Sequence, residues 1–82
     1  MNPRRVLRKI IASPANVRFG ELVGLVQAFG FRLARVSGGH HIFLHPQVPQ
    51  AVTIQNVDGK AKPYQVRQVL KLVEQYNLQL PD

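Results

Sequence analysis

The sequence predicts an α+β fold in which a three-stranded antiparallel sheet carries helices on one face. Two segments with apolar residues at helical spacing come first, three short segments with alternating apolar and polar residues follow, and a third helical segment closes the chain. The connections between the alternating segments are short, which favours an antiparallel meander. We therefore expect the order α-α-β-β-β-α, with the other face of the sheet in solvent.

The composition predicts one small globular domain. Of the 82 residues, 45% are hydrophobic and only 18% are charged, and there is no cysteine for a disulfide or a thiolate metal site. Charges interrupt the apolar residues near the N-terminus, and no apolar run is long enough to span a bilayer. We expect a soluble cytoplasmic protein with a single domain over residues 1–82, in which residues 1–13 form an additional N-terminal helix.

Two helices are predicted before the strands. The first covers Arg4–Ala12, with Asn2 as N-cap and Pro3 at the first helical position, where its missing N–H is harmless. The second covers Phe19–Phe29, and Gly30 follows it as the left-handed residue beyond the last turn. The predicted apolar stripes are Leu7, Ile10 and Ile11 in the first helix, and Leu22, Leu25, Val26 and Phe29 in the second.

The strands and the last helix follow in order. Strands are predicted over Phe31–Val36, His40–Leu44 and Ala51–Gln55, with a loop from Pro46 through Gln50. An Asp-Gly pair predicts a turn after the third strand, and Pro63 opens the last helix. The inward residues are predicted to be Val52 and Ile54 in the third strand and Val66, Val69, Leu70 and Val73 in the helix.

All three histidines lie within six positions of the second strand, directly after a Gly38-Gly39 turn. Side chains alternate along a strand, so His40 lies on one face, and His41 and His45 lie on the other. Phe43 shares the face of His41 and is the largest side chain of the strand, so we expect it to be buried and His40 to point outward. Imidazole, with an unperturbed pKa of about 6.5, is suited to proton transfer near neutrality.

The charge balance indicates an anionic partner. Eleven Lys and Arg against four acids give a formal net charge of +7, spread over most of the chain. Such a field attracts polyanions, chiefly nucleic acid, and would also attract an acidic protein.

A longer motif resembles a known family. Its residues are Gly38-Gly39-His40-His41-Ile42-Phe43-x-His45-Pro46, preceded by Gly30-Phe31-Arg32-Leu33 and followed by Lys62-Pro63-Tyr64-Gln65-Val66-Arg67-Gln68. From about Val17 onward, this pattern is similar to the HicA toxins of bacterial toxin–antitoxin systems. The usual turn in that family is Gly-Ser-His, and this sequence has Gly39 in place of the serine. The family's catalytic histidine maps onto His40, and the doublet keeps His41 as a second candidate.

The resemblance implies an mRNA-cleaving toxin with the α-β-β-β-α fold of double-stranded-RNA-binding domains, inhibited by a HicB-type antitoxin. The helix within residues 1–13 lies outside the minimal version of that fold. We expect a monomer when the antitoxin is absent.

The chemistry can be argued without the family. RNA carries its own nucleophile, the 2′-OH, so a metal-free endoribonuclease needs an acid/base group and cations for the developing charge. Here His40 or His41 is the predicted acid/base. The predicted phosphate-binding groups are Arg32, Arg35, Lys60, Lys62 and the backbone amides of Gly38 and Gly39.

Other functions remain open at this point. A non-catalytic RNA-binding module of the same fold, or an inactive toxin relative lacking the serine, would use the same basic surface. An adaptor for an acidic protein is a third class. A three-histidine metal site is disfavoured because neighbouring strand residues face opposite ways, and no acidic pair supports a two-metal nuclease, so we expect no cofactor or metal.

Overall fold

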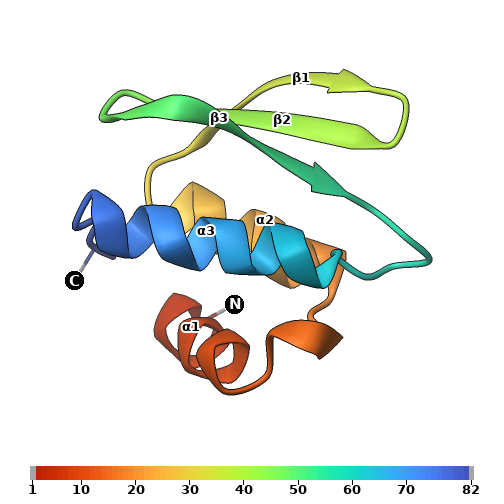
Figure 1. Ribbon diagram of the computed structural model, residues 1–82, viewed down its shortest axis with the longest axis horizontal. Coiled ribbons are helices and arrows are strands. Elements are labelled where there is room, and N and C mark those ends of the chain that lie inside the picture. The colour runs from red at the N-terminus through yellow and green to blue at the C-terminus, as the bar shows by residue number, and fades with distance from the viewer. Residues whose placement is uncertain (1, 82) are drawn as a thin grey trace.

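Three helices and a three-stranded sheet make up the protein, whose computed structural model describes residues 2–81. The elements are α1 (Pro3–Ala12), a short 3-10 turn (Pro14–Asn16), α2 (Phe19–Ala28), β1 (Arg32–Ser37), β2 (His40–His45), β3 (Val48–Gln55) and α3 (Pro63–Gln75). Figure 1 shows α2 and α3 under one face of the sheet, and α1 on the far side of these two helices. The predicted α-α-β-β-β-α order is confirmed. None of the helices in the described part of the chain is both long and apolar enough to cross a bilayer.

Helix α1 begins as predicted but buries a different stripe. The Asn2 side chain accepts hydrogen bonds from the backbone N–H groups of Arg4 and Arg5 at 3.1 and 3.3 Å, and caps the helix. Val6 and Ile10 are buried, whereas Ile11 is 61% exposed. The prediction that Ile11 belongs to the core was wrong. Leu7, also predicted for the stripe, is partly buried against the core. Helix α1 therefore packs through Val6, Leu7 and Ile10, and Ile11, about 100° around the helix from Ile10, lies outside this surface.

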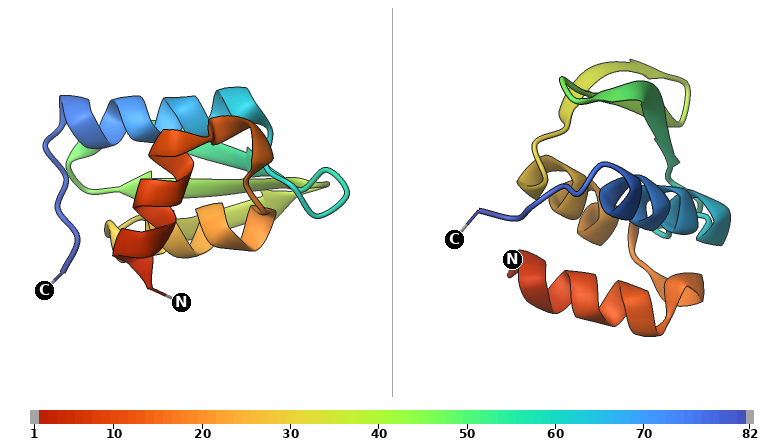
Figure 2. Two further views of the ribbon diagram at one scale, coloured as in Figure 1. Left: turned by 90° about the horizontal axis from the view of Figure 1, so that it is seen from below. Right: turned by 60° about the vertical axis from the view of Figure 1, so that its left-hand side comes forward.

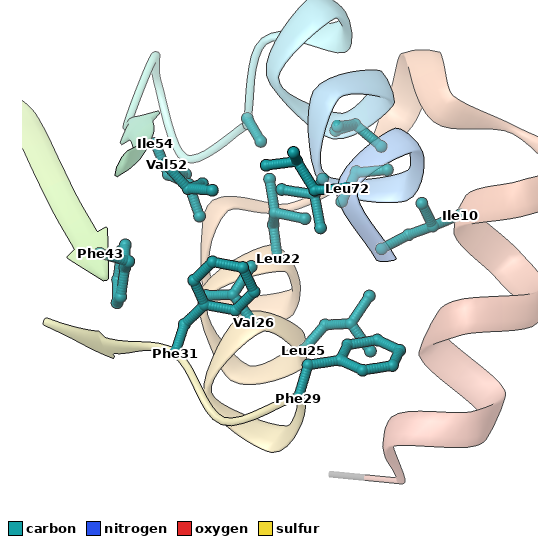
Figure 3. Packing of buried hydrophobic residues seen from close by; sticks show 14 of the residues in the cluster. Ile10, Leu22, Leu25, Val26, Phe29, Phe31, Phe43, Val52, Ile54 and Leu72 are labelled. Atoms are coloured by element: carbon teal, nitrogen blue, oxygen red, sulfur yellow. The ribbon is translucent and has the colours of Figure 1, made fainter. Parts of the chain in front are cut away.

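The core extends from the sheet through the α2–α3 layer to Val6 and Ile10 of α1. Figure 3 shows aromatic and branched side chains from both layers interdigitating. The sheet side contributes Phe31, Phe43, Val52 and Ile54, all at most 2% exposed, and the helices contribute Leu22, Leu25, Val26, Phe29, Val66, Val69 and Leu72. Leu70 and Val73, which were also predicted to be inward, are partly buried against this core. The predicted inward residues of α2 and β3 are confirmed.

The sheet is an antiparallel meander of order β1-β2-β3, with β2 in the centre. In its register His40 lies between Ser37 of β1 and Gln55 of β3. Pairing along β1 shifts between Leu33 and Arg35, which marks a bulge in this edge strand.

Strand β3 begins earlier than predicted, because Val48, Pro49 and Gln50 belong to it. The prediction of a loop through Gln50 was wrong. Proline lacks an N–H to donate, but β3 is an edge strand, and a proline is accommodated there when its nitrogen faces solvent.

Left-handed residues end the elements where the sequence predicts turns. Gly30 has φ 102°, Asp58 and Gly59 have φ 51° and 84°, and Asn77 after α3 has φ 50°. The segment after α3 folds back, so that Leu78 is only 7% exposed.

The two ends of the described chain meet on the helical side of the molecule. A guanidinium nitrogen of Arg4 donates to the backbone oxygen of Pro81 at 3.4 Å. Figure 2 shows that both ends lie away from the outer face of the sheet.

Candidate active site

The exposed face of the sheet carries the first histidine of β2. Phe43 is 1% exposed and points toward the helices, so alternation along the strand turns His40 outward, where it is exposed. The predicted orientation of the two faces is confirmed. Within residues 2–81, the His40 imidazole has no hydrogen-bond partner, so its ring nitrogens are available to a ligand.

Two arginines share this outer face with His40. Arg35 is paired with Ile42 and Arg32 with Leu44, and both arginines are exposed. Because Ile42 follows His40 by two residues, Arg35 is the diagonal cross-strand neighbour of His40, at a typical Cβ separation of about 7–8 Å. Neither guanidinium has a partner among the described residues. Arg35 is thus the cation best placed to contact a group that His40 also contacts.

The turn before His40 consists of two glycines, Gly38 and Gly39, but the backbone conformation requires glycine at only one of the two positions. Gly38 has φ 60°, a value that favours glycine. At Gly39 the backbone is ordinary, and an added Cβ would meet nothing within 4 Å. A larger side chain at position 39 would therefore fit beside His40.

His41 points to the other side of the sheet. Its half-buried ring lies edge-on to Phe19 of α2, with 4.8 Å between ring centroids. Its Nδ1 atom is buried and has no hydrogen-bond partner. His41 therefore lies on the opposite face of the sheet from His40, packed against the partly buried Phe19.

His45 is held at both ring nitrogens. Nδ1 accepts the backbone N–H of Gln47 at 3.0 Å, so the ring proton lies on Nε2, which donates to the backbone oxygen of Phe29 at 3.0 Å. The ring also lies edge-on to Phe31, with 4.9 Å between centroids. The three histidines do not converge, and residues 2–81 contain no cluster of three or more His, Asp or Glu side chains that could hold a metal ion.

The two predicted lysines lie beyond the end of β3. Lys60 is in the turn between β3 and α3 and lines a cavity of about 520 Å³ on the helical side of the molecule. Lys62 precedes α3, with its Nζ 6.0 Å from the centre of the Tyr64 ring. The structure therefore places Arg35 beside His40 on the outer face, and Arg32 further along the same face opposite Leu44, but it places Lys60 in a separate cleft. That cleft is also lined by Lys9 and Arg18, which sequence reasoning left out.

A buried glutamine supports the strand end opposite His40. Gln65 is 2% exposed, and its Oε1 accepts the backbone N–H of Gln55 at 2.8 Å. Its Nε2 donates to the hydroxyl of Tyr64 at 3.3 Å. Because β3 is an edge strand, this contact satisfies an N–H that no further strand can reach. The only signal in the sequence was a polar residue next to the apolar stripe of α3.

Comparison with known proteins identifies the chain. Residues 19–74 match the family model described as "HicA toxin of bacterial toxin-antitoxin", which covers everything from α2 to the end of α3 except the last residue. A comparison with curated proteins gave no match. The matched region contains His40, both arginines and both lysines, and it leaves out α1, Lys9 and Arg18. Because the match spans more than half of the 82 residues, the chain belongs to the HicA family of toxins of bacterial toxin–antitoxin systems.

Proposed function

We propose that this toxin is a metal-independent endoribonuclease that cleaves mRNA with His40 as its acid/base group. The observation that carries the proposal is the setting of His40, which is exposed at the start of the central strand, has no partner among residues 2–81 and lies diagonal to Arg35. Family membership supplies the toxin role and implies a cognate antitoxin.

The chemistry uses the nucleophile of the substrate. His40 takes the proton of the ribose 2′-hydroxyl as the 2′-oxygen attacks the adjacent phosphorus. The bond to the 5′-oxygen then breaks, and this oxygen takes a proton from water as it leaves, giving a 2′,3′-cyclic phosphate and a 5′-hydroxyl. A positioned general acid/base contributes about 10²–10⁴-fold to the rate. Arg35, and Arg32 further along the same face, would stabilise the extra negative charge on the phosphorane.

The surroundings of the doublet favour His40 over His41. A substrate phosphate can approach an exposed imidazole on the outer face directly. To reach the ring of His41, it would have to enter the layer between the sheet and α2, where the ring packs on Phe19. We therefore assign catalysis to His40, and the packing on Phe19 to His41.

The antitoxin in this proposal is a HicB-type protein that binds the monomeric toxin and keeps RNA from His40. The formal net charge of +7 favours an acidic partner surface. The outer face also offers Leu44, which is 49% exposed, to apolar contacts. Because mRNA is the proposed substrate, we place both proteins in the cytoplasm.

The test is RNA cleavage by purified protein in the presence of EDTA. We expect the wild type to cleave a labelled single-stranded RNA, and His40→Ala to lose at least about 10²-fold in rate while still binding the RNA. The matched control is His41→Phe, which keeps a ring against Phe19 and should retain cleavage. Loss of cleavage in His41→Phe with retention in His40→Ala would contradict the assignment. A cleavage rate that needs a divalent metal would contradict the mechanism.

A second candidate function is a non-catalytic RNA-binding protein of the same family. Gly39, where the family has a serine, is the observation that favours it. In that case the wild type and His40→Ala would bind RNA equally, and neither would cleave it or arrest growth when expressed without the antitoxin.

A further inference from the structure

A basic cleft lies at the same end of the molecule as His40, on the side away from the outer sheet face. Its volume is about 520 Å³, and its lining residues are Lys9, Asn16, Arg18, Asp58, Gly59 and Lys60. Figure 1 shows why these residues meet. The 3-10 turn that follows α1, the start of α2 and the turn between β3 and α3 lie toward the right, below the turn between β1 and β2.

Backbone hydrogen bonds hold two walls of the cleft together. The N–H of Phe19 donates to the oxygen of Gly59, and the N–H of Ala61 donates to the oxygen of Val17, both at 2.9 Å. These bonds set Arg18 opposite Lys60 in an isolated antiparallel bridge. The turn itself is fixed by the Asn56 side chain, which accepts the N–H of Gly59 at 2.7 Å. The two cations are therefore neighbours in a fixed frame.

One of the three cations that line the cleft forms an ion pair in the described part of the chain, and the other two do not. Lys9 Nζ donates to both carboxylate oxygens of Glu21 at 2.9 and 2.8 Å, and the backbone N–H of Arg18 also donates to this carboxylate at 3.0 Å. The bond from Lys9, followed by that from Arg18, lowers the pKa of Glu21, so this pair is ionised and mutually compensated. Within residues 2–81, neither the Arg18 guanidinium nor the Lys60 ammonium forms an ion pair or hydrogen bond with a carboxylate, although the Arg18 charge also helps to lower the pKa of Glu21. Asp58 is the only acid in the lining.

We propose that this cleft binds a backbone phosphate of the RNA strand whose cleavage occurs at His40, an inference that rests on the proposed function. A strand that leaves His40 past its β3 neighbour Gln55 can follow the turn that begins at Asn56 and leads to Lys60. Arg18 and Lys60 would donate to the phosphate, whereas Lys9 stays paired with Glu21. Because Lys9 and Arg18 lie outside residues 19–74, the family match does not account for this subsite.

The test measures RNA binding in a His40→Ala background, so that the strand stays intact. Arg18→Gln/Lys60→Gln should weaken the binding of a single strand of about ten nucleotides roughly tenfold at low salt. It should also reduce the slope of log K against log[salt] by about 0.7, the value for one phosphate on a single strand. The matched control is Arg8→Gln/Lys71→Gln, which also lowers the net charge of +7 by two but removes one arginine and one lysine that line other cavities. The control pair should change the slope much less.

A third variant should increase the affinity for RNA instead of lowering it. Asp58→Asn removes the acid from the lining, and asparagine tolerates the φ of 51° at this position. RNA binding should become tighter. Unchanged or weaker binding would contradict a phosphate at this site.

Cleavage assays on proteins that retain His40 distinguish the proposed phosphate subsite from the proposed catalytic role of His40. Because the cleft lies on the side of the molecule away from the outer sheet face, Arg18→Gln/Lys60→Gln should raise KM much more for the longer strand than for a dinucleotide. Equal effects of the cleft pair and the control pair on binding would overturn the subsite and leave the role of His40 standing. Selective loss of RNA binding by the cleft pair, in a protein that cleaves nothing, would support the subsite and overturn the nuclease. No RNA binding by any form would overturn both.

Discussion

Strand β2 begins and ends with a histidine, and the surroundings of the two imidazoles are opposite. At the start of the strand, His40 is exposed and has no partner among residues 2–81. At its end, His45 is bonded through both ring nitrogens and packed against Phe31. One residue type therefore serves two purposes in one strand. A histidine whose nitrogens are both engaged joins a loop to the sheet, whereas one with free nitrogens can take part in proton transfer.

The largest expected effect on stability belongs to the His45 end. His45→Ala removes two hydrogen bonds and an aromatic contact and should lower the free energy of unfolding by about 2–3 kcal/mol. His40→Ala removes an exposed ring and should change it by no more than about 0.5 kcal/mol. Urea denaturation of both variants measures the difference. Equal losses of unfolding free energy in the two variants would show that His45 does not stabilise the fold more than His40 does.

Gly30 should be the next most sensitive position. Its φ is 102°, and an added Cβ would lie 3.0 Å from Nε2 of His45. Gly30→Ala should therefore cost about 2 kcal/mol through backbone strain and displacement of the ring. In a double-mutant cycle with His45→Ala, part of this cost should disappear, because the atom that the Cβ would touch is gone. Strictly additive losses would exclude that contact as the cause.

Substitution of Gln65 tests whether its bond to Gln55 stabilises the end of β3 that pairs with His40. Gln65→Leu leaves the backbone N–H of Gln55 without its partner and should cost about 1–2 kcal/mol. Amide hydrogen exchange should become faster at Gln55 in particular. Gln68→Leu is the matched control, since Gln68 is exposed on the same helix. Unchanged exchange at Gln55 would show that Gln65 is not what protects this strand end.

The smallest effect on stability is expected at Gly39. Because an added Cβ meets nothing there, Gly39→Ser should change the free energy of unfolding by less than about 0.5 kcal/mol. Gly38→Ser, at φ 60°, should cost about 1 kcal/mol. If a hydroxyl beside His40 donates to the substrate phosphate, Gly39→Ser should also raise the cleavage rate about tenfold. A rate unchanged by this substitution would indicate that the missing serine does not limit activity.

Rules that use only neighbouring residues were enough to predict the exposed position of His40 and the places of the helices. Period-two alternation and the size of Phe43 placed His40 on the solvent face, and the caps at Asn2, Gly30 and Pro63 located the helices. These features depend on residues within a few positions of one another. The same rules put Ile11 in the core, because the sequence does not show that α1 packs through the side that carries Val6, Leu7 and Ile10.

The fixed position of His45 and the basic cleft depend on contacts between segments that are distant in the sequence. His45 is fixed by the backbone oxygen of Phe29, which no side-chain pattern reveals. The basic cleft combines positions 9, 18 and 60, and a backbone bridge that forms only in the folded chain makes two of them neighbours. Pro49 was read as a loop residue because the sequence does not say that β3 lies at an edge.

The contact between Arg4 and Pro81 gathers both ends of the described chain behind the helices. A tether attached at either end would emerge from the back of the molecule and leave the outer sheet face open to solution. Surface immobilisation or a fluorescent fusion at either end should therefore leave His40 accessible, and one anchored sample could serve for RNA and antitoxin titrations alike.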